Sequence, residues 1–226
     1  MDLRFDDFVL AAATADLADE VAARDAADAV EFRMDFADDA RDQLAAYGGD
    51  LPLIATNRPT WEGGEATDEG RIDDLLAAAA HDAVAAVDVE LATLRDRDDG
   101  LVSELHDRDA RVVVSTHDFE ATPAPESMRE TLRSATAQGD VGKLAVTATD
   151  RADVLDLLSV THELDREGER VATMAMGTAG RHSRAVAPLY GSRIGYAPVD
   201  PADATAPGQF DLETLASLVT ELRPED

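Results

Sequence analysis

The single lysine of the chain, Lys143, is the first candidate for chemistry, because the other nineteen long basic side chains are all arginines. It lies within the apolar segment 141–146, which is typical of a buried strand. Burial disfavours the charged ammonium, and a neutral lysine amine is the nucleophile that forms Schiff bases with carbonyl substrates. The alternative is a lysine at a strand end whose ammonium extends into solvent. The side chains on neighbouring strands favour the nucleophile.

His117 ends the preceding hydrophobic segment, at the point where it breaks into a loop. Histidine titrates near neutrality and is the most frequent general acid or base. A lone histidine in this place would more often be structural. Neighbouring strands of a parallel barrel bring their carboxyl ends to one ligand, so Lys143 and His117 on adjacent strands predict a site for imine formation and proton transfer.

Charged residues also end an earlier segment, which reads Glu31-Phe32-Arg33-Met34-Asp35. The alternation of a strand places Glu31, Arg33 and Asp35 on one face, directed into the barrel. A buried charge needs an opposite charge nearby, so we expect Glu31 and Arg33 to hold each other. They form either a structural ion pair or a pair that hydrogen-bonds a polyhydroxylated ligand.

Two further segments carry charges near their carboxyl ends. Arg58 follows one of them, with Glu62, Gly63 and Gly64 in the loop after it. Arg58 either binds anionic or hydroxyl groups as a bidentate donor or extends into solvent as a loop arginine. Glu90 ends the next segment, and we expect it to be an ion-pair partner in the barrel core rather than an acid that acts near the lysine.

The last third of the chain supplies the remaining candidates. Met174 and Met176 give an apolar wall, with simple core packing as the alternative, and Arg184 is suited to bind a carboxylate. A Pro-Gly turn follows the last predicted strand, between the hydroxyl of Thr205 and the amide of Gln209. This turn becomes a lid only if a substrate site lies beneath it.

The elements that must position these side chains alternate along the sequence as strand-like and helix-like segments. Most strand-like segments are apolar on both faces, as in parallel sheets covered by helices. They predict an α/β fold, a (β/α)₈ TIM barrel of a single domain spanning residues 1–226. A doubly wound open sheet is the alternative, but the glycine-rich turn that it usually carries after the first strand is replaced here by residues 11–14, Ala-Ala-Ala-Thr.

The predicted strands cover residues 8–13, 29–35, 51–57, 85–91, 111–117, 141–148, 170–176 and 192–198. The predicted helices cover residues 14–24, 36–46, 68–83, 101–107, 125–137, 151–164 and 211–222, and segment 177–190 is expected to be rich in loops and half helical. Thr14 and Asp211 are the expected N-caps of the first and last helices.

Acidic residues dominate the charge of the chain: Asp and Glu total 48 against 20 Lys and Arg, which gives a net charge of −28. Such a charge strains a compact fold at ordinary ionic strength. Salt at 1 M shortens the Debye length to about 3 Å, so the composition predicts a protein that works in concentrated salt. The absence of a basic patch from the sequence excludes nucleic acid as an expected partner.

The composition also limits the compartment and the metal chemistry. The chain has no cysteine, which excludes disulfides and thiolate metal sites. No apolar run approaches the roughly 20 residues that span a bilayer, and residues 1–7 do not resemble a signal peptide. We therefore expect a cytoplasmic protein with no membrane partner.

The polar segments resemble, in the same order, the type I 3-dehydroquinate dehydratases of the shikimate pathway. Each motif alone is weak, but eight in register are specific. The matching segments are 31–35, 56–58 with 62–64, 115–119 with 122–123, 142–143, 174–177, 183–184, 191–192 and 206–209. The resemblance implies a (β/α)₈ barrel, usually a homodimer, that needs no metal and no cofactor.

The resemblance also implies the reaction, in which 3-dehydroquinate loses water to give 3-dehydroshikimate. Lys143 would form the imine, His117 would move protons, and Glu62 would orient this histidine. Arg184 would bind the ring carboxylate. The groups implied at the substrate hydroxyls are Glu31, Arg33 and Arg58, and those implied in the closing loop are Thr205 and Gln209.

The sequence departs from the family pattern at three places. Thr205 replaces the usual serine but keeps the hydroxyl, and Tyr196 stands where the family commonly has a phenylalanine. The first strand lacks a polar residue that some members use, so we assign it no contact.

Two other functions compete with this interpretation. A class I aldolase-type barrel also uses a lysine imine but often binds a phosphate near its last two strands, whereas Arg184 and the Pro-Gly-Gln loop suit a carboxylate better. A non-enzymatic acidic module that binds basic partners predicts no dependence on Lys143 and no cluster of polar residues at strand ends.

Overall fold

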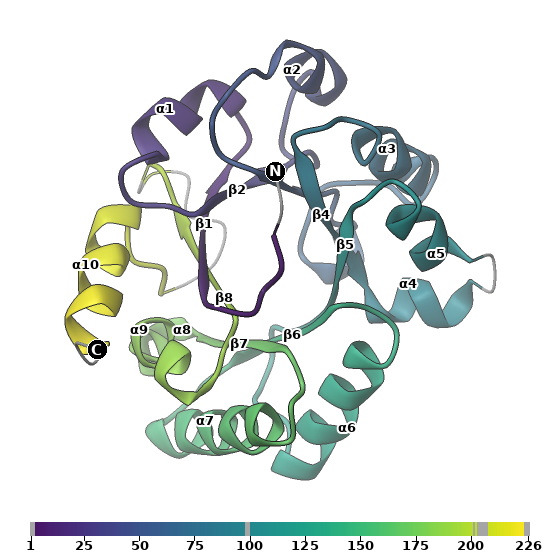
Figure 1. The fold of residues 1–226 in the computed structure, drawn as a ribbon. Coiled ribbons are helices and arrows are strands. Elements are labelled where there is room, and N and C mark those ends of the chain that lie inside the picture. The colour runs from purple at the N-terminus through teal and green to yellow at the C-terminus, as the bar shows by residue number, and fades with distance from the viewer. Residues whose placement is uncertain (1–2, 98–99, 201, 203–207, 224–226) are drawn as a thin grey trace.

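Eight parallel strands form a barrel surrounded by helices in the computed structural model, which describes residues 3–97, 100–200, 202 and 208–223 (Figure 1). Each strand from β1 to β6 pairs with the next along the chain, and β1 also pairs with β8. This sequential order confirms the predicted (β/α)₈ barrel, because a doubly wound sheet reverses its strand order. The strands are β1 (Val9–Thr14), β2 (Ala29–Arg33), β3 (Leu53–Thr56), β4 (Val84–Glu90), β5 (Arg111–Asp118), β6 (Val141–Thr147), β7 (Val171–Met176) and β8 (Ile194–Pro198).

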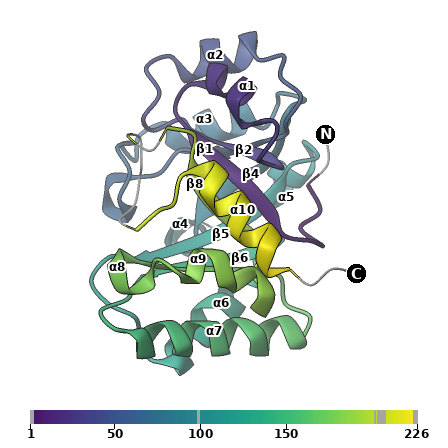
Figure 2. The same cartoon turned by 90° about the vertical axis from the view of Figure 1, so that its left-hand side faces the viewer.

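Helices cover the outside of this barrel, and the side view shows α10 lying over β8 and beside α9 (Figure 2). They bury their apolar faces against the outward residues of the strands. The helices are α1 (Glu20–Ala23), α2 (Ala40–Ala46), α3 (Arg71–Ala78), α4 (Leu91–Asp96), α5 (Leu101–His106), α6 (Pro125–Thr136), α7 (Arg151–Arg166), α8 (Gly177–Gly180), α9 (Ser183–Val186) and α10 (Leu212–Leu222). Three shorter 3₁₀ turns are η1 (Leu17–Asp19), η2 (Thr60–Glu62) and η3 (Ala187–Tyr190).

The barrel closes between β7 and β8 through a few hydrogen bonds rather than a continuous ladder. The backbone N–H of Arg193 donates to the carbonyl of Val171 at 2.8 Å. The buried hydroxyl of Ser192 accepts from the N–H of Thr173 at 2.9 Å. Ser192 therefore satisfies a backbone donor that a paired strand would otherwise satisfy.

The amino-terminal end of the barrel is filled by the segment that precedes β1. Leu3 and Phe5 are buried there in one apolar cluster with Val9 and Ile194 (Figure 1). This plug leaves the opposite end, where the strands have their carboxyl termini, as the end at which polar side chains can line an opening.

The predicted strand boundaries agree with the observed ones within two residues. The prediction that Thr14 caps the first helix was wrong: Thr14 ends β1, and Asp16 caps η1 by accepting from the N–H of Ala18. Helix α4 was missed, because it begins at Leu91 directly after β4 and has no side-chain cap. Asp211 caps α10 as predicted and accepts from the N–H of Thr214 at 2.9 Å.

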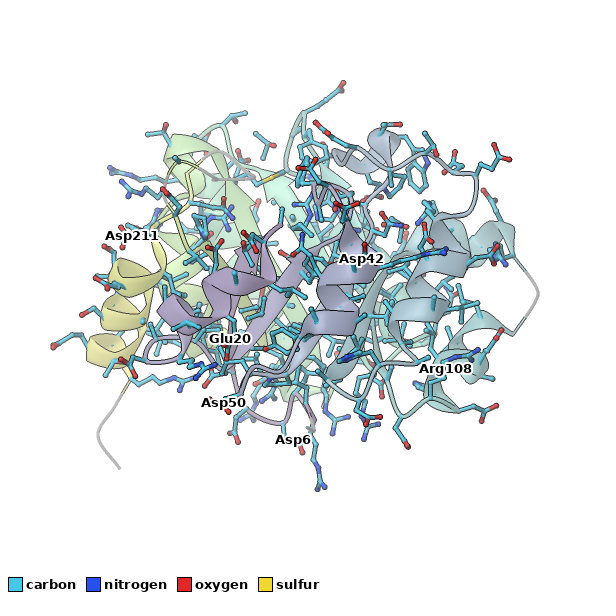
Figure 3. All side chains as sticks on the ribbon, turned by 90° about the horizontal axis from the view of Figure 1, so that it is seen from above. Asp6, Glu20, Asp42, Asp50, Arg108 and Asp211 are labelled. Carbon is cyan, nitrogen blue, oxygen red and sulfur yellow. The ribbon has the colours of Figure 1, made fainter. Side chains whose placement is uncertain are left out.

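Acidic side chains lie on the outer surface of the barrel as well as in the charged cluster of its interior. Asp6, Asp42 and Asp50 are exposed and come from the amino-terminal segment, from α2 and from the loop before β3 (Figure 3). The excess negative charge of the chain is therefore solvated in these places rather than buried in the core.

Candidate active site

Lys143 extends from β6 into the barrel interior and forms a buried ion pair with Asp88 of β4. The distance from Nζ to Oδ2 is 2.9 Å, and the two residues are 4% and 0% exposed. The ring of Tyr196, on β8, lies 4.3 Å from Nζ. The alternative of a lysine that extends into solvent is therefore wrong.

Asp88 is held ionised by the groups around it. Its Oδ1 accepts from the hydroxyl of Ser115 at 2.6 Å and pairs with Arg58 at 2.9 Å. Burial alone would raise the pKa of Asp88, but the positive charges of Arg58 and Lys143, together with these hydrogen bonds, hold it well below its usual value. Asp88 therefore provides a fixed negative charge beside the lysine nitrogen.

His117 lies near the end of β5, against Glu62 of η2, with 2.6 Å between Nδ1 and Oε2. Burial lowers the pKa of His117 well below its ordinary value, and the positive charges of Arg58 and Lys143 act in the same direction. The neutral imidazole that donates its Nδ1–H to the Glu62 carboxylate leaves Nε2 as a proton acceptor. Phe119 stacks on the ring, with centroids 5.8 Å apart and an interplanar angle of 12°.

Glu62 is poised to change protonation near neutrality. Burial raises its pKa to about 7; Arg58 opposes this rise, while the negative charges of Glu90 and Asp88 add to it. Its position depends on the glycines that follow, because Gly63 has a φ of 79°, in the left-handed region, and a Cβ there would meet the ring of Phe119. A Cβ on Gly64 would meet the backbone carbonyl of Arg58.

Arg58 is buried in the barrel rather than exposed in the loop, with only 3% of its surface accessible. It pairs with Glu90 at 2.8 Å in addition to Asp88. Glu90 also pairs with Arg71 at 2.8 Å, which confirms the prediction that Glu90 is an ion-pair partner in the core. The negative charges around Arg58 raise its pKa and outweigh the opposite effect of burial. Arg58 therefore remains charged and fixed beside the lysine.

The expected ion pair between Glu31 and Arg33 is wrong. Arg33 instead pairs with Asp35: Nε donates to Oδ1 at 2.9 Å, and Nη2 donates to Oδ2 at 2.6 Å. Strand β2 ends at Arg33, and the turn that follows brings the carboxylate of Asp35 back to the guanidinium. Glu31 accepts from the hydroxyl of Thr56 at 3.0 Å.

Arg184, on α9, differs from Arg58 and Lys143, which both have carboxylate partners. It is 5% exposed, and among the described residues it has no ion-pair partner and its Nε has no hydrogen-bond partner. Burial lowers its pKa to about 10. A buried guanidinium without a carboxylate is costly to the fold and well suited to bind an anionic ligand.

These side chains line one cavity at the carboxyl end of the barrel. It opens to solvent, and charged side chains share its lining with an apolar wall, as in small-molecule sites. Within the described part of the chain, no group of three or more His, Cys, Asp or Glu residues is placed to hold a metal ion. The predicted residues that line the cavity are Glu31, Arg33, Arg58, Glu62, His117, Lys143, Met174, Met176, Arg184 and Gln209.

A sequence model described as type I 3-dehydroquinase matches residues 9–225. The chain belongs to the type I 3-dehydroquinase family. This family works through a covalent lysine imine and no external cofactor. Membership overturns both the aldolase-type alternative and the acidic interaction module.

Relatives and solved structures agree with the family. A 3-dehydroquinate dehydratase of Haloarcula marismortui is 62% identical over 98% of this chain and 99% of its own length. The crystal structure of 3-dehydroquinate dehydratase from Geobacillus kaustophilus is 29% identical, with a TM-score of 0.84 over 96% of this chain and 91% of that one. A type I enzyme from Clostridium difficile, solved with covalently modified comenic acid, is 26% identical with a TM-score of 0.82 over 96% and 92%.

One predicted 3-dehydroquinase residue lies outside the described part of the structure, namely Thr205 of the closing loop. Three residues of the site were not predicted: Asp88, Ser115 and Tyr196. Asp88 alternates with valines and with Glu90 along β4, so both acids face the interior. That alternation was the signal available in the sequence for Asp88.

Proposed function

We propose that this chain dehydrates 3-dehydroquinate to 3-dehydroshikimate, as a step of the shikimate pathway, through an imine on Lys143. The observation that carries the proposal is one cavity that holds a buried lysine amine, a neutral histidine and a buried arginine without a carboxylate partner among the described residues. These groups match a substrate that has a ketone, an acidic C–H beside it and a carboxylate.

Substrate binding follows from the charges that line the cavity. Arg184 takes the ring carboxylate, because an anion relieves the cost of its buried charge. Glu31, Arg33 and Arg58, which line the same cavity, bind the ring hydroxyls. Met174 and Met176 form the apolar wall against the ring, and Gln209 lines the same cavity.

Lys143 starts the reaction when its ammonium, held by Asp88, releases a proton to water and the free amine adds to the ketone carbon. Loss of water gives a protonated imine, whose positive charge lies beside the Asp88 carboxylate that previously held the ammonium. The protonated imine is a stronger electron sink than the ketone and so acidifies the neighbouring C–H.

His117 then moves the proton. Its Nε2 removes the proton from the acidified carbon, and the Glu62 carboxylate stabilises the imidazolium that results. The electrons left behind expel the hydroxyl group on the next carbon, and the imidazolium returns its proton to that oxygen, which leaves as water. Hydrolysis of the imine frees 3-dehydroshikimate, and the fixed ring orientation supports each step.

Reductive trapping tests this proposal directly. Borohydride added with 3-dehydroquinate should attach one ligand mass to Lys143, the only lysine in the sequence, and peptide mapping should distinguish it from the amino terminus. Lys143→Ala should lose both trapping and turnover, followed as ultraviolet absorbance of the conjugated product. His117→Ala is the matched control, because it should keep trapping while turnover falls. Turnover that persists in Lys143→Ala would refute the imine.

The surroundings in which the enzyme works are part of the proposal. The net charge of −28 and the relative from Haloarcula marismortui support activity in concentrated salt. Family resemblance supports a single catalytic domain, a homodimer and a cytoplasmic location. None of the helices in the described residues is long and apolar enough to cross a membrane.

A further inference from the structure

Tyr196 carries a hydroxyl that the proposed mechanism does not use. The residue lies on β8, is 4% exposed and lines the same cavity as Lys143. Its hydroxyl is buried and has no hydrogen-bond partner among the described residues. Leaving such a group without a partner costs stability, so its retention in a native protein calls for a catalytic or binding explanation.

Two carboxylates, Glu31 and Asp88, exert their negative charge on Tyr196, but both already have other partners. Glu31 accepts from Thr56 at 3.0 Å, and Asp88 pairs with Lys143 at 2.9 Å. Burial raises the pKa of Tyr196 well above its usual value, and the charges of Glu31 and Asp88 add to the rise. Tyr196 therefore stays protonated near neutral pH, where it acts as a hydrogen-bond donor or acceptor and not as a titrating group.

The position of the ring shows which substrate oxygen is within reach. Nζ of Lys143 lies 4.3 Å from the ring centroid, so the carbon that Nζ attacks must come to rest beside the same ring. The oxygen of the attacked carbonyl is bonded to that carbon and stays next to Nζ throughout the addition. The Tyr196 hydroxyl has no other hydrogen-bond partner among the described residues.

We propose that the Tyr196 hydroxyl donates a hydrogen bond to the carbonyl oxygen of the substrate while Lys143 adds to the carbonyl carbon. The C–N bond forms, the π electrons of the carbonyl move to oxygen, and the hydroxyl stabilises the charge that develops there without losing its own proton. The same contact serves the reverse addition, when water attacks the imine. This inference rests on the proposed imine mechanism and extends it by one residue.

Tyr196→Phe tests the assignment, since it deletes only the oxygen and keeps the aromatic ring beneath Lys143. The rate of imine formation is measured by rapid mixing with 3-dehydroquinate and timed borohydride quenching, with mass spectrometry of the protein. We expect that rate and kcat/KM to fall by about tenfold or more, which corresponds to a well-placed hydrogen bond. The melting temperature should be unchanged or higher, because the deleted hydroxyl has no partner in the free protein.

Thr116→Val is the matched control. Thr116 carries another buried hydroxyl without a partner among the described residues, but it does not line the cavity. This variant should leave the rate of imine formation unchanged. The inference would be overturned by a loss smaller than about tenfold in Tyr196→Phe, by a rise in KM alone, or by a drop in melting temperature that accounts for the lost activity.

The wild-type protein separates failure of this inference from failure of the proposed function. If borohydride attaches no ligand to Lys143 in the wild type, the imine mechanism itself is wrong. If the wild type is trapped and Tyr196→Phe is trapped at the same rate, the mechanism stands and only the role of Tyr196 is refuted.

Discussion

Replacing Arg184 with methionine should make the protein more stable and a poorer binder of its substrate. Burial lowers the pKa of Arg184 from 12.5 to about 10, and each pKa unit corresponds to about 1.4 kcal/mol. Because the folded pKa of this base lies below the unfolded one, the charge disfavours folding at neutral pH. That penalty is about 3 kcal/mol, and it declines only as the pH rises past about 10.

The two effects of Arg184→Met are measured separately. Urea unfolding at pH 7 should show a free energy of unfolding raised by about 1–3 kcal/mol, since methionine keeps most of the packing volume without the charge. Steady-state kinetics should show KM raised about ten- to a hundredfold with little change in kcat, because charged hydrogen bonds contribute about 1.5–3 kcal/mol.

Arg71→Met is the control for this reasoning. Arg71 is also buried, but it pairs with Glu90 at 2.8 Å, so its removal leaves a buried carboxylate with fewer partners. We expect this variant to lose about 3–5 kcal/mol of stability. If Arg184→Met were destabilised to a similar extent and kept its KM, Arg184 would be a structural residue and the carboxylate site would lie elsewhere.

Three further changes probe the charges of the site and of the surface. Asp88→Asn should destabilise the fold by about 3–5 kcal/mol in urea unfolding and slow borohydride trapping on Lys143, and unchanged values in both would remove Asp88 from the lysine's environment. The kcat/KM of the native protein should fall as the pH drops below about 7, where Glu62 gains a proton and the imidazolium of His117 loses its charge partner. Glu62→Gln should lower kcat/KM and remove this fall of kcat/KM below pH 7. If the variant still shows the fall, the group that titrates is not Glu62. Activity and melting temperature should both rise between 0.1 M and molar KCl, since salt screens a net charge of −28; activity that is highest without salt would refute the halophilic interpretation.

Composition and local pattern were sufficient for the barrel and for its principal reactive groups. Eight apolar segments separated by helical patterns specify strands covered on both faces, and the strand boundaries agree with the structure within two residues. Lys143 and His117 were identified because they fall on adjacent predicted strands, and neighbouring strands of a parallel barrel bring their carboxyl ends to one ligand. Alternation along β4 determined that Glu90 faces the interior, where it pairs with arginine.

Which carboxylate pairs with which cation could be learned only from the structure. The sequence could not say that Arg33 pairs with Asp35 rather than Glu31, because the turn after β2 determines which carboxylate comes back to the guanidinium. Asp88 became the lysine's partner through a contact between β4 and β6, strands that do not pair directly. Such distances depend on the stagger and tilt of the whole barrel, which no local pattern records.

The sequence by itself determined which residue types are present and which face of each strand they occupy, since these follow from side-chain alternation and hydrophobic burial. Only the closed barrel decided which charges are compensated. Arg58 has two carboxylates beside it, whereas Arg184 has none among the described residues, although both are buried arginines of one cavity. The physical reason is that electrostatic energy depends on distances of a few ångströms across strands that are far apart in the chain.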